Sequence, residues 1–346
     1  MVPKVRRRDV AEHAGVSEAL VSYVLNNKAA QNRIPPQTAE RVREAAAKLG
    51  YRPSVFGRAL KIQKSNLLAL VSEDLTDHHT TELFRALSRV TQKSGFGLFV
   101  MELSIHPASA LEDLRAMELG FAEGIFLHLP SASKLPPGNS GQLLGKPACV
   151  VGRQFSDTDV PCVEVDNVAG AQLAIRHLCE AGAQRIGVVA DRRDYPFVQE
   201  RLDGCAAALK DFKDCAAHVY YRQGTEDQYQ AGIAAVEEWR NLRLVPDAVF
   251  AMGDMIAVGV LHALHQSGIP CPQRIKVVGF DGLPLGRYTT PSLSTIQQPY
   301  EAMAEAAFDV VRRGLAGEPA PTTTKRLILV PSLVTRESSS THPARS

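Results

Sequence analysis

The sequence contains no apolar run long enough to cross a membrane. Its apolar stretches are short, as at residues 67–71, whereas a transmembrane helix needs about 20 apolar residues. No apolar segment follows the basic residues at the N-terminus, which disfavours an export signal. With 45% hydrophobic and 22% charged residues, the composition is typical of a globular protein. We therefore expect a cytoplasmic protein of two or three domains, without a membrane partner.

Signatures of metal, redox and catalytic sites are also missing. The six cysteines lie singly, with no Cys-x-x-Cys pair, so we expect free thiols that act as small apolar residues and no metal site. The motifs G-x-x-x-x-G-K-[ST], H-E-x-x-H and G-x-S-x-G do not occur. Gly95-Phe96-Gly97 is too short for a dinucleotide fingerprint. We expect no cofactor and no enzymatic activity.

Positive charge is scarce in most of the chain and concentrated at its start. Residues 1–64 contain thirteen Lys or Arg and five Asp or Glu, a balance of +8, whereas the other residues contain 26 and 32, a balance of −6. A basic segment favours a polyanion as partner, because binding releases counterions condensed on phosphates. A solvated basic face alone would not explain the helical pattern of the same segment.

Residues 9–26 read as two short helices around a glycine turn. Ser17 is placed to cap the second helix, whose apolar residues fall on one face. The opposite face carries short polar groups and one aromatic ring, which suit a major groove: Glu18, Ala19, Ser22, Tyr23 and Asn26. A third helix over residues 38–49 would end at Gly50, the usual residue of a left-handed C-terminal cap. The pattern predicts a helix-turn-helix.

These residues resemble the lactose-repressor (LacI) family of bacterial transcription regulators. The shared pattern is D-V-A-x-x-A-G-V-S-x-x-x-V-S-x-V-L-N over residues 9–26 and G-Y-x-P-x-x-x-x-R-x-L over residues 50–60. The resemblance implies that Glu18, Ala19 and Tyr23 read bases in the major groove. It also implies phosphate contacts by Ser17, Ser22 and Asn26.

Three departures from the family pattern fall in this segment. Arg6-Arg7-Arg8 stands where the family usually has Thr-Ile/Leu, so the capping Thr at the start of the first helix is lost and phosphate-seeking charge is gained, with Arg6 and Arg7 as expected phosphate contacts. The stretch at residues 27–37 looks about three residues longer than usual. Gly57 replaces the commoner Ala.

Residues 53–61 correspond to the hinge helix that enters the minor groove in this family. The resemblance assigns minor-groove contacts to Arg58, Ala59, Leu60 and Lys61, with Leu60 as a wedge between base pairs. The segment is too short for a stable helix, and Gly57 costs it about 1 kcal/mol relative to Ala. We expect it to fold only when a partner holds it.

From residue 67 onward, short apolar runs alternate with amphipathic stretches, as in parallel doubly wound sheets. We expect strands at residues 67–71, 97–101, 124–127, 149–151, 185–189, 218–221, 248–250 and 276–279. We expect helices over amphipathic stretches such as residues 169–181, 198–211, 229–241 and 256–266. Ligands of such folds lie at the carboxyl ends of the strands or between two lobes.

Motifs in this body resemble the effector domains of the same family, which are similar to periplasmic sugar-binding proteins. They are Val165-Asp166-Asn167-x-x-Gly170-Ala171, Arg185-Ile186-Gly187, Arg201-Leu202-x-Gly204 and Gly279-Phe280-Asp281. The resemblance implies an α/β fold with a helix-turn-helix headpiece (1–52), a hinge (53–64) and a two-lobed effector domain. Lobe 1 would hold residues 65–165 and 296–323, and lobe 2 residues 166–295 and 324–338. Residues 339–346 would form a disordered tail.

The resemblance places effector-binding residues at His79, Thr80, Arg153, Arg201, Asp254 and Asp281. Arg201 would grip ligand oxygens, and Asp281 would accept from ligand O–H or N–H groups. Plainer alternatives are an ion pair between lobes for Arg201 and a turn or cap for Asp281.

Two departures affect this cleft. Asp77-His78-His79-Thr80 stands where the family usually has Asn-Pro-Phe-Phe; the loss of aromatic surface weakens sugar stacking, and the imidazoles favour an anionic or polar ligand. Metal binding by these histidines is the less favoured interpretation. Gly253 stands where many sugar-responsive members have Asn.

The sequence therefore predicts a homodimeric regulator, most often a repressor in this family, that binds a pseudo-palindromic double-stranded DNA operator. A small-molecule effector, a sugar or related polar metabolite, would control it. A cytoplasmic solute-binding protein and a sugar-handling enzyme on a similar body are the alternatives. The basic N-terminal segment disfavours the first, and the missing catalytic motifs disfavour the second. The polar C-terminus carries no heptad pattern, so we expect no coiled-coil tetramer.

Overall fold

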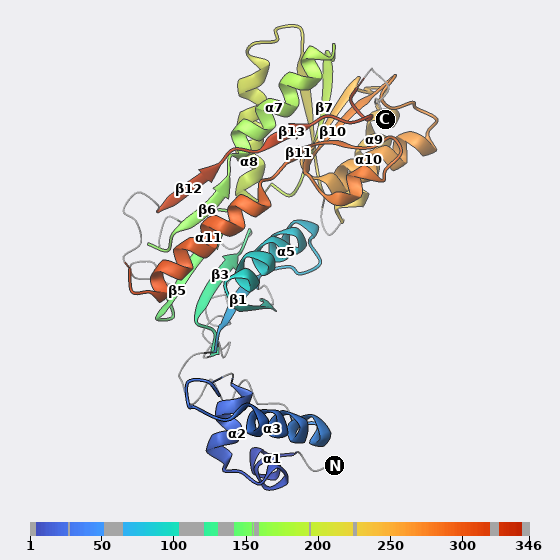
Figure 1. Cartoon of the computed structure of the whole chain (residues 1–346). Helices are drawn as coiled ribbons and strands as arrows, with labels where there is room; N and C mark the ends of the chain where they lie inside the picture. The colour runs from blue at the N-terminus through green and yellow to red at the C-terminus, as the bar shows by residue number, and fades with distance from the viewer. Residues whose placement is uncertain are drawn as a thin grey trace. The chain divides into compact units, whose positions relative to one another are not determined.

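The computed structural model describes residues 5–26, 28–51, 65–103, 121–130, 142–153, 155, 159–193, 195–223, 227–318 and 325–340. The chain divides into two compact units, Met1–Ser65 and Asn66–Ser346 (Figure 1). The first unit is the headpiece and the second is the body. Residues 52–64, with the expected minor-groove residues Arg58, Ala59, Leu60 and Lys61, lie outside the described part of the chain.

The headpiece is a three-helix unit around a small aliphatic core. Its helices are α1 (Arg7–Ala14), α2 (Glu18–Leu25) and α3 (Pro36–Leu49). Each helix contributes a fully buried valine to the core, namely Val10, Val21 with Val24, and Val42. The apolar spacing predicted the inward face of α2 correctly.

The helix ends follow from local chemistry. Gly15 and Gly50 end α1 and α3 with φ of +63° and +66°, which glycine adopts without strain. Ser17 caps α2, since its Oγ accepts the Leu20 N–H at 3.2 Å. Without a capping Thr, α1 is capped from within, because the Asp9 carboxylate accepts the Arg6 N–H at 2.7 Å. The predicted start of α3 was two residues late, since Pro36 fits the first helical turn.

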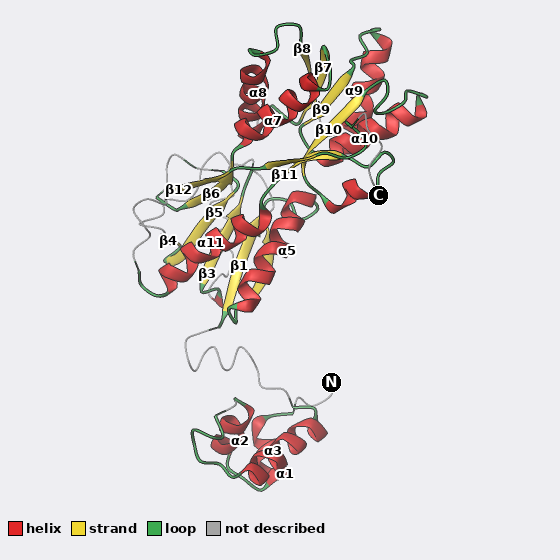
Figure 2. Ribbon diagram, turned by 45° about the horizontal axis from the view of Figure 1, so that its top comes forward, coloured by secondary structure: helices red, strands yellow, loops and turns green. Residues whose placement is uncertain are grey.

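Lobe 1 of the body is built on a sheet of strand order β12-β6-β5-β3-β1-β2, with β4 paired to β5. The strands are β1 (Leu67–Ser72), β2 (Gly97–Glu102), β3 (Gly124–His128), β4 (Gln142–Leu143), β5 (Lys146–Val151), β6 (Cys162–Val165) and β12 (Arg326–Leu329). Every pair is parallel except β4 with β5. The helices α5 (His78–Lys93) and α11 (Tyr300–Leu315) lie side by side over this sheet (Figure 2).

Both faces of this sheet are buried. Leu68 and Leu70 of β1 pack with Leu83 of α5 and Phe308 of α11. The intervening Ala69 and Val71 belong to the apolar cluster on the opposite face. Because successive strand residues alternate between faces, a strand buried on both sides is apolar throughout, as β1 is.

Lobe 2 has a second sheet of order β13-β11-β10-β9-β7-β8. Its strands are β7 (Arg185–Ala190), β8 (Ala216–Tyr221), β9 (Ala248–Ala251), β10 (Lys276–Asp281), β11 (Ser294–Gln297) and β13 (Ser332–Val334). Its helices are α7 (Asn167–Glu180), α8 (Pro196–Leu209), α9 (Gln228–Asn241), α10 (Asp254–Gln266) and the short η2 (Pro284–Arg287). One cluster joins α7 and α8 to the sheet through Phe250 and Phe280, and another joins α9 and α10 through Trp239 and Ile256.

The chain crosses between lobes three times. It enters lobe 2 after β6 and returns between β11 and α11. The last crossing was expected near residue 324, and this was wrong. Strand β12 pairs in parallel with β6 of lobe 1, so residues 326–329 belong to lobe 1 and the chain crosses at Val330–Pro331.

The expected tail also began too early. Ser338 and Ser339 are buried, and the Ser339 hydroxyl lies 2.7 Å from both His177 Nε2 and Ser294 Oγ. These hydrogen bonds fix residues 338–340 onto lobe 2. Residues 341–346 lie outside the described part.

Candidate functional site

The polar face of α2 is accessible on the headpiece. Glu18 and Ala19 are exposed, and Tyr23 exposes 43% of its surface. Ser22 and Asn26 are half-buried, because they lie nearer the apolar side. The three residues expected to read bases therefore share one accessible face of a capped helix.

The residues expected to contact phosphate differ in what they can offer. The Ser17 oxygen accepts from the helix backbone, which leaves its O–H able to donate. The Asn26 side-chain amide donates to the Ser22 carbonyl at 2.7 Å, so part of its donor capacity serves the helix end. Arg6 and Arg7 are exposed.

Arg7 contacts a residue of α2 that is expected to read bases. Its Nε donates to the Glu18 carboxylate at 3.0 Å, which joins the first turns of α1 and α2. One residue later, Arg8 pairs instead with Glu12 within α1 at 2.8 Å. Sequence reasoning assigned Arg7 to phosphate and Glu18 to bases without relating them, because their proximity depends on how α1 packs against α2.

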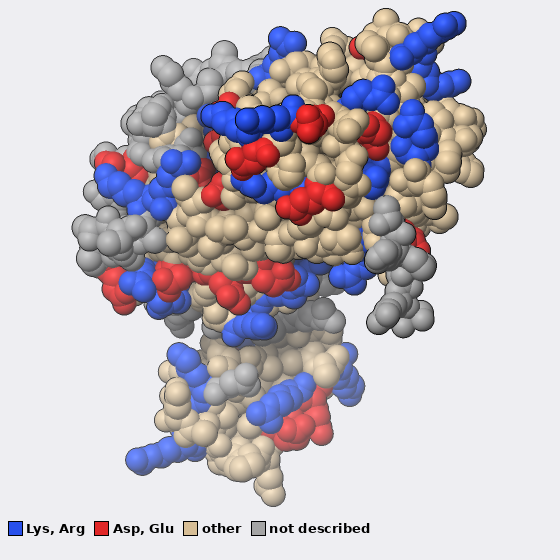
Figure 3. Space-filling view, turned by 90° about the horizontal axis from the view of Figure 1, so that it is seen from above, with Lys and Arg blue, Asp and Glu red and all other residues tan. Residues whose placement is uncertain are grey.

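The excess of basic residues belongs to the headpiece segment, since residues 1–64 have a balance of +8 and the rest of the chain a balance of −6. Acidic and basic side chains are interspersed on the face of the body seen in Figure 3. Mixed charges of this kind are ordinary for a protein surface and form no footprint for a polyanion.

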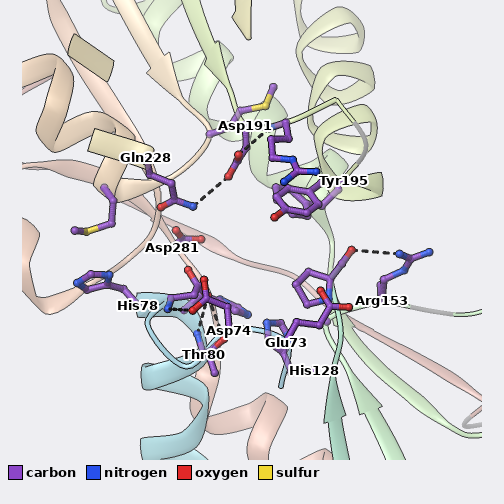
Figure 4. A pocket seen from close by; sticks show the side chains of 18 of the residues that line it. Glu73, Asp74, His78, Thr80, His128, Arg153, Asp191, Tyr195, Gln228 and Asp281 are labelled. Atoms are coloured by element: carbon purple, nitrogen blue, oxygen red, sulfur yellow. Dashed lines mark hydrogen bonds between the residues drawn. The ribbon is translucent and has the colours of Figure 1, made fainter. Parts of the chain in front are cut away.

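The body holds a cleft of about 690 Å³ between its two lobes. Its walls are the carboxyl ends of parallel strands: His128 ends β3, Asp281 ends β10, and Asp191 directly follows β7. Figure 4 shows these side chains around one space. Five of the six expected effector residues line it, namely His79, Thr80, Arg153, Arg201 and Asp281.

Arg201 is a buried cation held in a fixed orientation. Its Nε donates to Asn167 Oδ1 at 2.9 Å and its Nη1 to the Met252 carbonyl at 2.6 Å. The guanidinium carbon lies 3.5 Å from the centre of the Phe280 ring, and Phe197 flanks it at 4.7 Å. Burial lowers the pKa of Arg201 from its usual value, although nearby Asp281 and Asp191 raise it.

The guanidinium keeps donor capacity for a ligand. Of its five N–H groups, two are used by these hydrogen bonds, so three remain among the described contacts. The ion pair between lobes that was the alternative for Arg201 is not observed among the described residues.

Asp281 closes the base of the cleft in a strained conformation. Its φ is +119°, which side chains other than glycine rarely adopt and which is often found at functional sites. Its Oδ1 accepts from Gln298 Nε2 at 2.8 Å. Burial raises the pKa of Asp281 to about 7, and the Arg201 guanidinium counteracts this shift.

Gln298 connects the two lobes through its hydrogen bond to Asp281. Its Nε2 also lies 3.2 Å from Nδ1 of His79, and Tyr300 Oη lies 3.0 Å from the same nitrogen. Since an amide nitrogen only donates, His79 Nδ1 accepts. The Oε1 atom of Gln298 is buried and has no hydrogen-bond partner among the described residues.

His79 lies in a polar cluster of the cleft and carries a neutral imidazole. Burial lowers the pKa of His79 well below its usual value of 6.5, and nearby His128 and Arg201 add to this effect. His128 Nδ1 donates to the Val151 carbonyl at 2.9 Å. Gly152 makes room for this ring, because a Cβ there would lie 3.0 Å from His128 Nδ1.

Asp254 is the expected effector residue that does not line the cleft. It is buried behind Asp281, where its carboxylate accepts from Thr295 Oγ1 at 2.5 Å and from the Leu283 N–H at 2.6 Å. Burial raises the pKa of Asp254 to about 8, and repulsion from Asp281 adds to the shift. Asp254 therefore supports the loop after β10 and does not face a ligand.

Several lining residues were missed from the sequence. Asp191 pairs with Arg222 at 2.6 Å and accepts from Gln228 Nε2 at 3.1 Å. Tyr195 and Phe197 stack with their ring centres 5.3 Å apart and stay half-buried in the cleft wall. A polar residue two positions after the predicted strand at 185–189 was the available signal for Asp191. The rings of Tyr195 and Phe197 provide aromatic surface in the cleft, which the sequence lacks at His79 and Thr80.

The charge of the lining disfavours an anionic ligand. Seven carboxyl groups and four guanidinium groups line the cleft, so carboxyl groups are in excess. With His79 neutral, the expectation of an anionic ligand loses its support, and a neutral polar ligand fits better. No group of three or more His, Cys, Asp or Glu among the described residues could hold a metal ion.

Two family models match the chain. The model of bacterial regulatory proteins of the lacI family matches residues 8–54, and that of the periplasmic binding protein-like domain matches residues 175–339. The transcriptional regulator GalS of Salmonella typhimurium is 34% identical over 338 residues, 96% of this chain and 95% of that protein. The ribose operon repressor of Halalkalibacterium halodurans is 29% identical, with 95% of this chain and 96% of that repressor covered.

Solved structures share the fold. The lac repressor dimer bound to operator superposes with a TM-score of 0.78 at 22% identity, covering 97% of this chain and 99% of that one. The complex of the transcriptional regulator CelR with cellobiose gives 0.65 at 25% identity, covering 96% and 99%. Among the helices that the structure describes, none has the length and apolar character to span a bilayer.

Proposed function

This chain belongs to the lacI family of bacterial regulatory proteins, and from that premise we propose that it is a sequence-specific transcriptional regulator controlled by a small molecule. The observation that carries the proposal is the buried Arg201 in a cleft between two lobes, where three of its N–H groups have no hydrogen-bond partner among the described residues. The same chain carries an accessible polar helix in a basic headpiece. Neither a solute-binding protein nor an enzyme on a similar body needs that headpiece.

We assign DNA reading to α2. Glu18, Ala19 and Tyr23 would contact base edges in the major groove, while Arg6 and Ser17 would position the helix on phosphates. One such helix reads only a few base pairs, so a homodimer on a pseudo-palindromic operator follows. The chain would act in the cytoplasm, where bacterial DNA lies.

We assign effector binding to the cleft and favour an uncharged sugar. Arg201 would donate to sugar hydroxyl oxygens, and Asp281 and Gln298 Oε1 would accept from hydroxyl groups. Tyr195 and Phe197 would cover the apolar face of a ring. The excess of carboxyl groups would repel a phosphate or carboxylate. Relatives include repressors of ribose operons, and one solved relative is a cellobiose complex, which supports a sugar.

We propose repression as the mode of action and no enzymatic activity. The relatives are named as repressors and regulators. One carboxylate of the cleft, that of Asp77, serves as a helix cap, since it accepts the Thr80 N–H.

A gel-shift titration tests both assignments. The full chain is titrated against the DNA upstream of its own gene and against random DNA, with and without neutral sugars such as ribose and cellobiose. Sugar phosphates serve as the anionic comparison. We expect specific binding that one neutral sugar changes and that sugar phosphates leave unchanged. Equal affinity for both DNAs would reject the reading function, and a response confined to anions would reject the effector class.

A further inference from the structure

Two of the six cysteines meet in lobe 2, although the sequence separates them by 36 positions. The Sγ atoms of Cys179 and Cys215 lie 3.0 Å apart, and the Cys179 S–H donates to the Cys215 sulfur. Both residues are half-buried, whereas Cys149, Cys162 and Cys205 are buried. All six cysteines are free thiols, as expected, but the fold brings these two into contact.

The surrounding structure already holds the two segments together. Cys179 lies in the last turn of α7, and Cys215 lies in the connection between α8 and β8. One turn before Cys179, Arg176 pairs with Asp211 at 2.5 Å across the same two segments. A disulfide bond is about 2.05 Å long, so the sulfur atoms need to approach by only about 1 Å.

We infer that Cys179 and Cys215 form a reversible disulfide, a thiol modification site whose oxidant is a low-molecular-weight disulfide. The inference rests on the body alone and does not depend on the proposed regulatory function. Half-buried thiols give a small oxidant access, which the buried cysteines lack.

The reaction is thiol–disulfide exchange in two steps. The Cys215 thiolate attacks one sulfur of the oxidant RSSR, which forms a mixed disulfide and releases RS⁻. The Cys179 thiolate then attacks the Cys215 sulfur, which forms the Cys179–Cys215 bond and releases a second RS⁻. The two leaving thiolates take up the two protons of the cysteines. Two electrons pass from the protein to the oxidant, which becomes two RSH.

The direction of attack follows from the environment of Cys179. Burial raises its pKa to about 12, and the hydrogen bond with Cys215 and the carboxylate of Glu180 act in the same direction. Cys179 is therefore the poorer first nucleophile, because the thiolate is the reactive form. Its S–H points at the Cys215 sulfur, so Cys215 is the acceptor of the pair.

The bond would strengthen lobe 2 without distorting the cleft. Asn167, which holds Arg201, starts the same helix twelve residues before Cys179, about 18 Å away along the axis. The disulfide would close a loop over the 36 positions that separate Cys179 from Cys215, and such a loop constrains the unfolded state. We expect the melting temperature of the body to rise by about 5–10 °C on oxidation.

The test uses the full chain, incubated with oxidised glutathione and then with excess reduced glutathione. Intact mass and peptide mapping after alkylation identify the product. We expect the loss of two hydrogens, one Cys179–Cys215 peptide, the higher melting temperature, and reversal on reduction. Cys179→Ser should stop at a glutathione adduct on Cys215. Cys271→Ser is the matched control at another half-buried cysteine, and it should oxidise like the unchanged protein.

Three results would overturn the inference. One is a stable glutathione adduct on the unchanged protein without the internal bond. Another is a disulfide between other cysteines. The third is an unmodified folded protein whose two thiols react with oxidised glutathione only after unfolding in urea.

Discussion

Arg7 and Glu18 form an ion pair that joins the start of α1 to the start of the proposed reading helix, with Arg7 Nε 3.0 Å from the Glu18 carboxylate. Their side chains are 43% and 46% exposed, so both stay accessible. An unpaired carboxylate at a DNA interface is repelled by phosphates. Arg7 counteracts this repulsion and fixes the direction in which Glu18 presents its oxygen atoms. The two residues should therefore act on DNA as one unit.

A double-mutant cycle tests that coupling. Glu18→Ala should reduce discrimination between operator and mismatched DNA by about 1–3 kcal/mol, because a carboxylate can accept from a cytosine amino group. Arg7→Ala should lose part of the same discrimination. The double variant should discriminate no worse than Glu18→Ala, with a coupling of about 0.5–1 kcal/mol. Affinities come from fluorescence anisotropy on operator variants with each base pair changed.

Arg8→Ala supplies the matched control on the same helix. Arg8 pairs with Glu12 and not with Glu18, so its loss should weaken binding to all DNA sequences similarly and add to the effect of Glu18→Ala. If Arg7→Ala behaves like Arg8→Ala, Arg7 is a phosphate contact only.

Arg201→Lys should abolish most of the effector response while leaving operator binding intact. Lysine keeps the charge but not the planar fork that donates to Asn167 and to the Met252 carbonyl. Effector affinity should fall by about 2–3 kcal/mol, measured by isothermal titration calorimetry. Arg176→Lys is the control, since Arg176 lies on the surface of lobe 2 in an exposed ion pair with Asp211. Unchanged affinity in Arg201→Lys would place the effector elsewhere.

The raised pKa of Asp254 gives stability a defined pH dependence. The folded state retains a proton on Asp254 up to about pH 8, whereas the unfolded chain releases it near the usual value of 3.8. The folded state thus binds more protons in this window, and this contribution to stability declines as the pH rises from about 4 to about 8. His79 acts oppositely, because its lowered pKa destabilises the fold as the pH falls below 6.5.

Asp254→Asn isolates the first contribution. Asparagine can accept from the Leu283 N–H and donate to Thr295, so the variant should fold. Its melting temperature, relative to the unchanged protein, should increase from about pH 5 to about pH 8. The melting temperature of Asp211→Asn should change with pH in the same way as that of the unchanged protein, because Asp211 lies in an exposed ion pair. Parallel profiles for Asp254→Asn as well would mean that Asp254 is ionised in the folded state.

The elements with strong periodicity were predictable from the sequence. The eight expected strands and four expected helices are all observed. They could be predicted because the spacing of apolar residues along each element shows which of its faces is buried. The strands β4, β6, β11, β12 and β13 were missed. These strands contain only two to four residues each. Pairing with a neighbouring strand defines them, whereas their local sequence pattern does not. The last crossing between lobes was misplaced for the same reason, since β12 is defined by its pairing with β6.

The role of a site residue could be predicted from the sequence only where the residue type itself implies that role. Arg201 and Asp281 came from family motifs, and both line the cleft. Asp254 came from the same kind of motif, yet the carboxylate turns toward Thr295, which no sequence pattern specifies. Pairs such as Arg7 with Glu18 or Cys179 with Cys215 depend on how separate helices and loops pack. Such pairs are properties of tertiary structure alone.

Gln298 should determine effector affinity through a buried acceptor of the cleft that has no partner among the described residues. Its Oε1 is buried, while its Nε2 holds Asp281 and contacts His79. A ligand hydroxyl that donates to Oε1 relieves the cost of leaving this atom unpaired, so Gln298→Ala should lower effector affinity by about 1–3 kcal/mol. Gln298→Glu should also weaken binding, because it places a carboxylate against Asp281. The control is Gln297→Ala, one residue earlier and not part of the cleft lining. Calorimetric titration of the effector gives the affinities. Normal affinity in Gln298→Ala would show that water, and not the effector, satisfies Oε1 in the working protein.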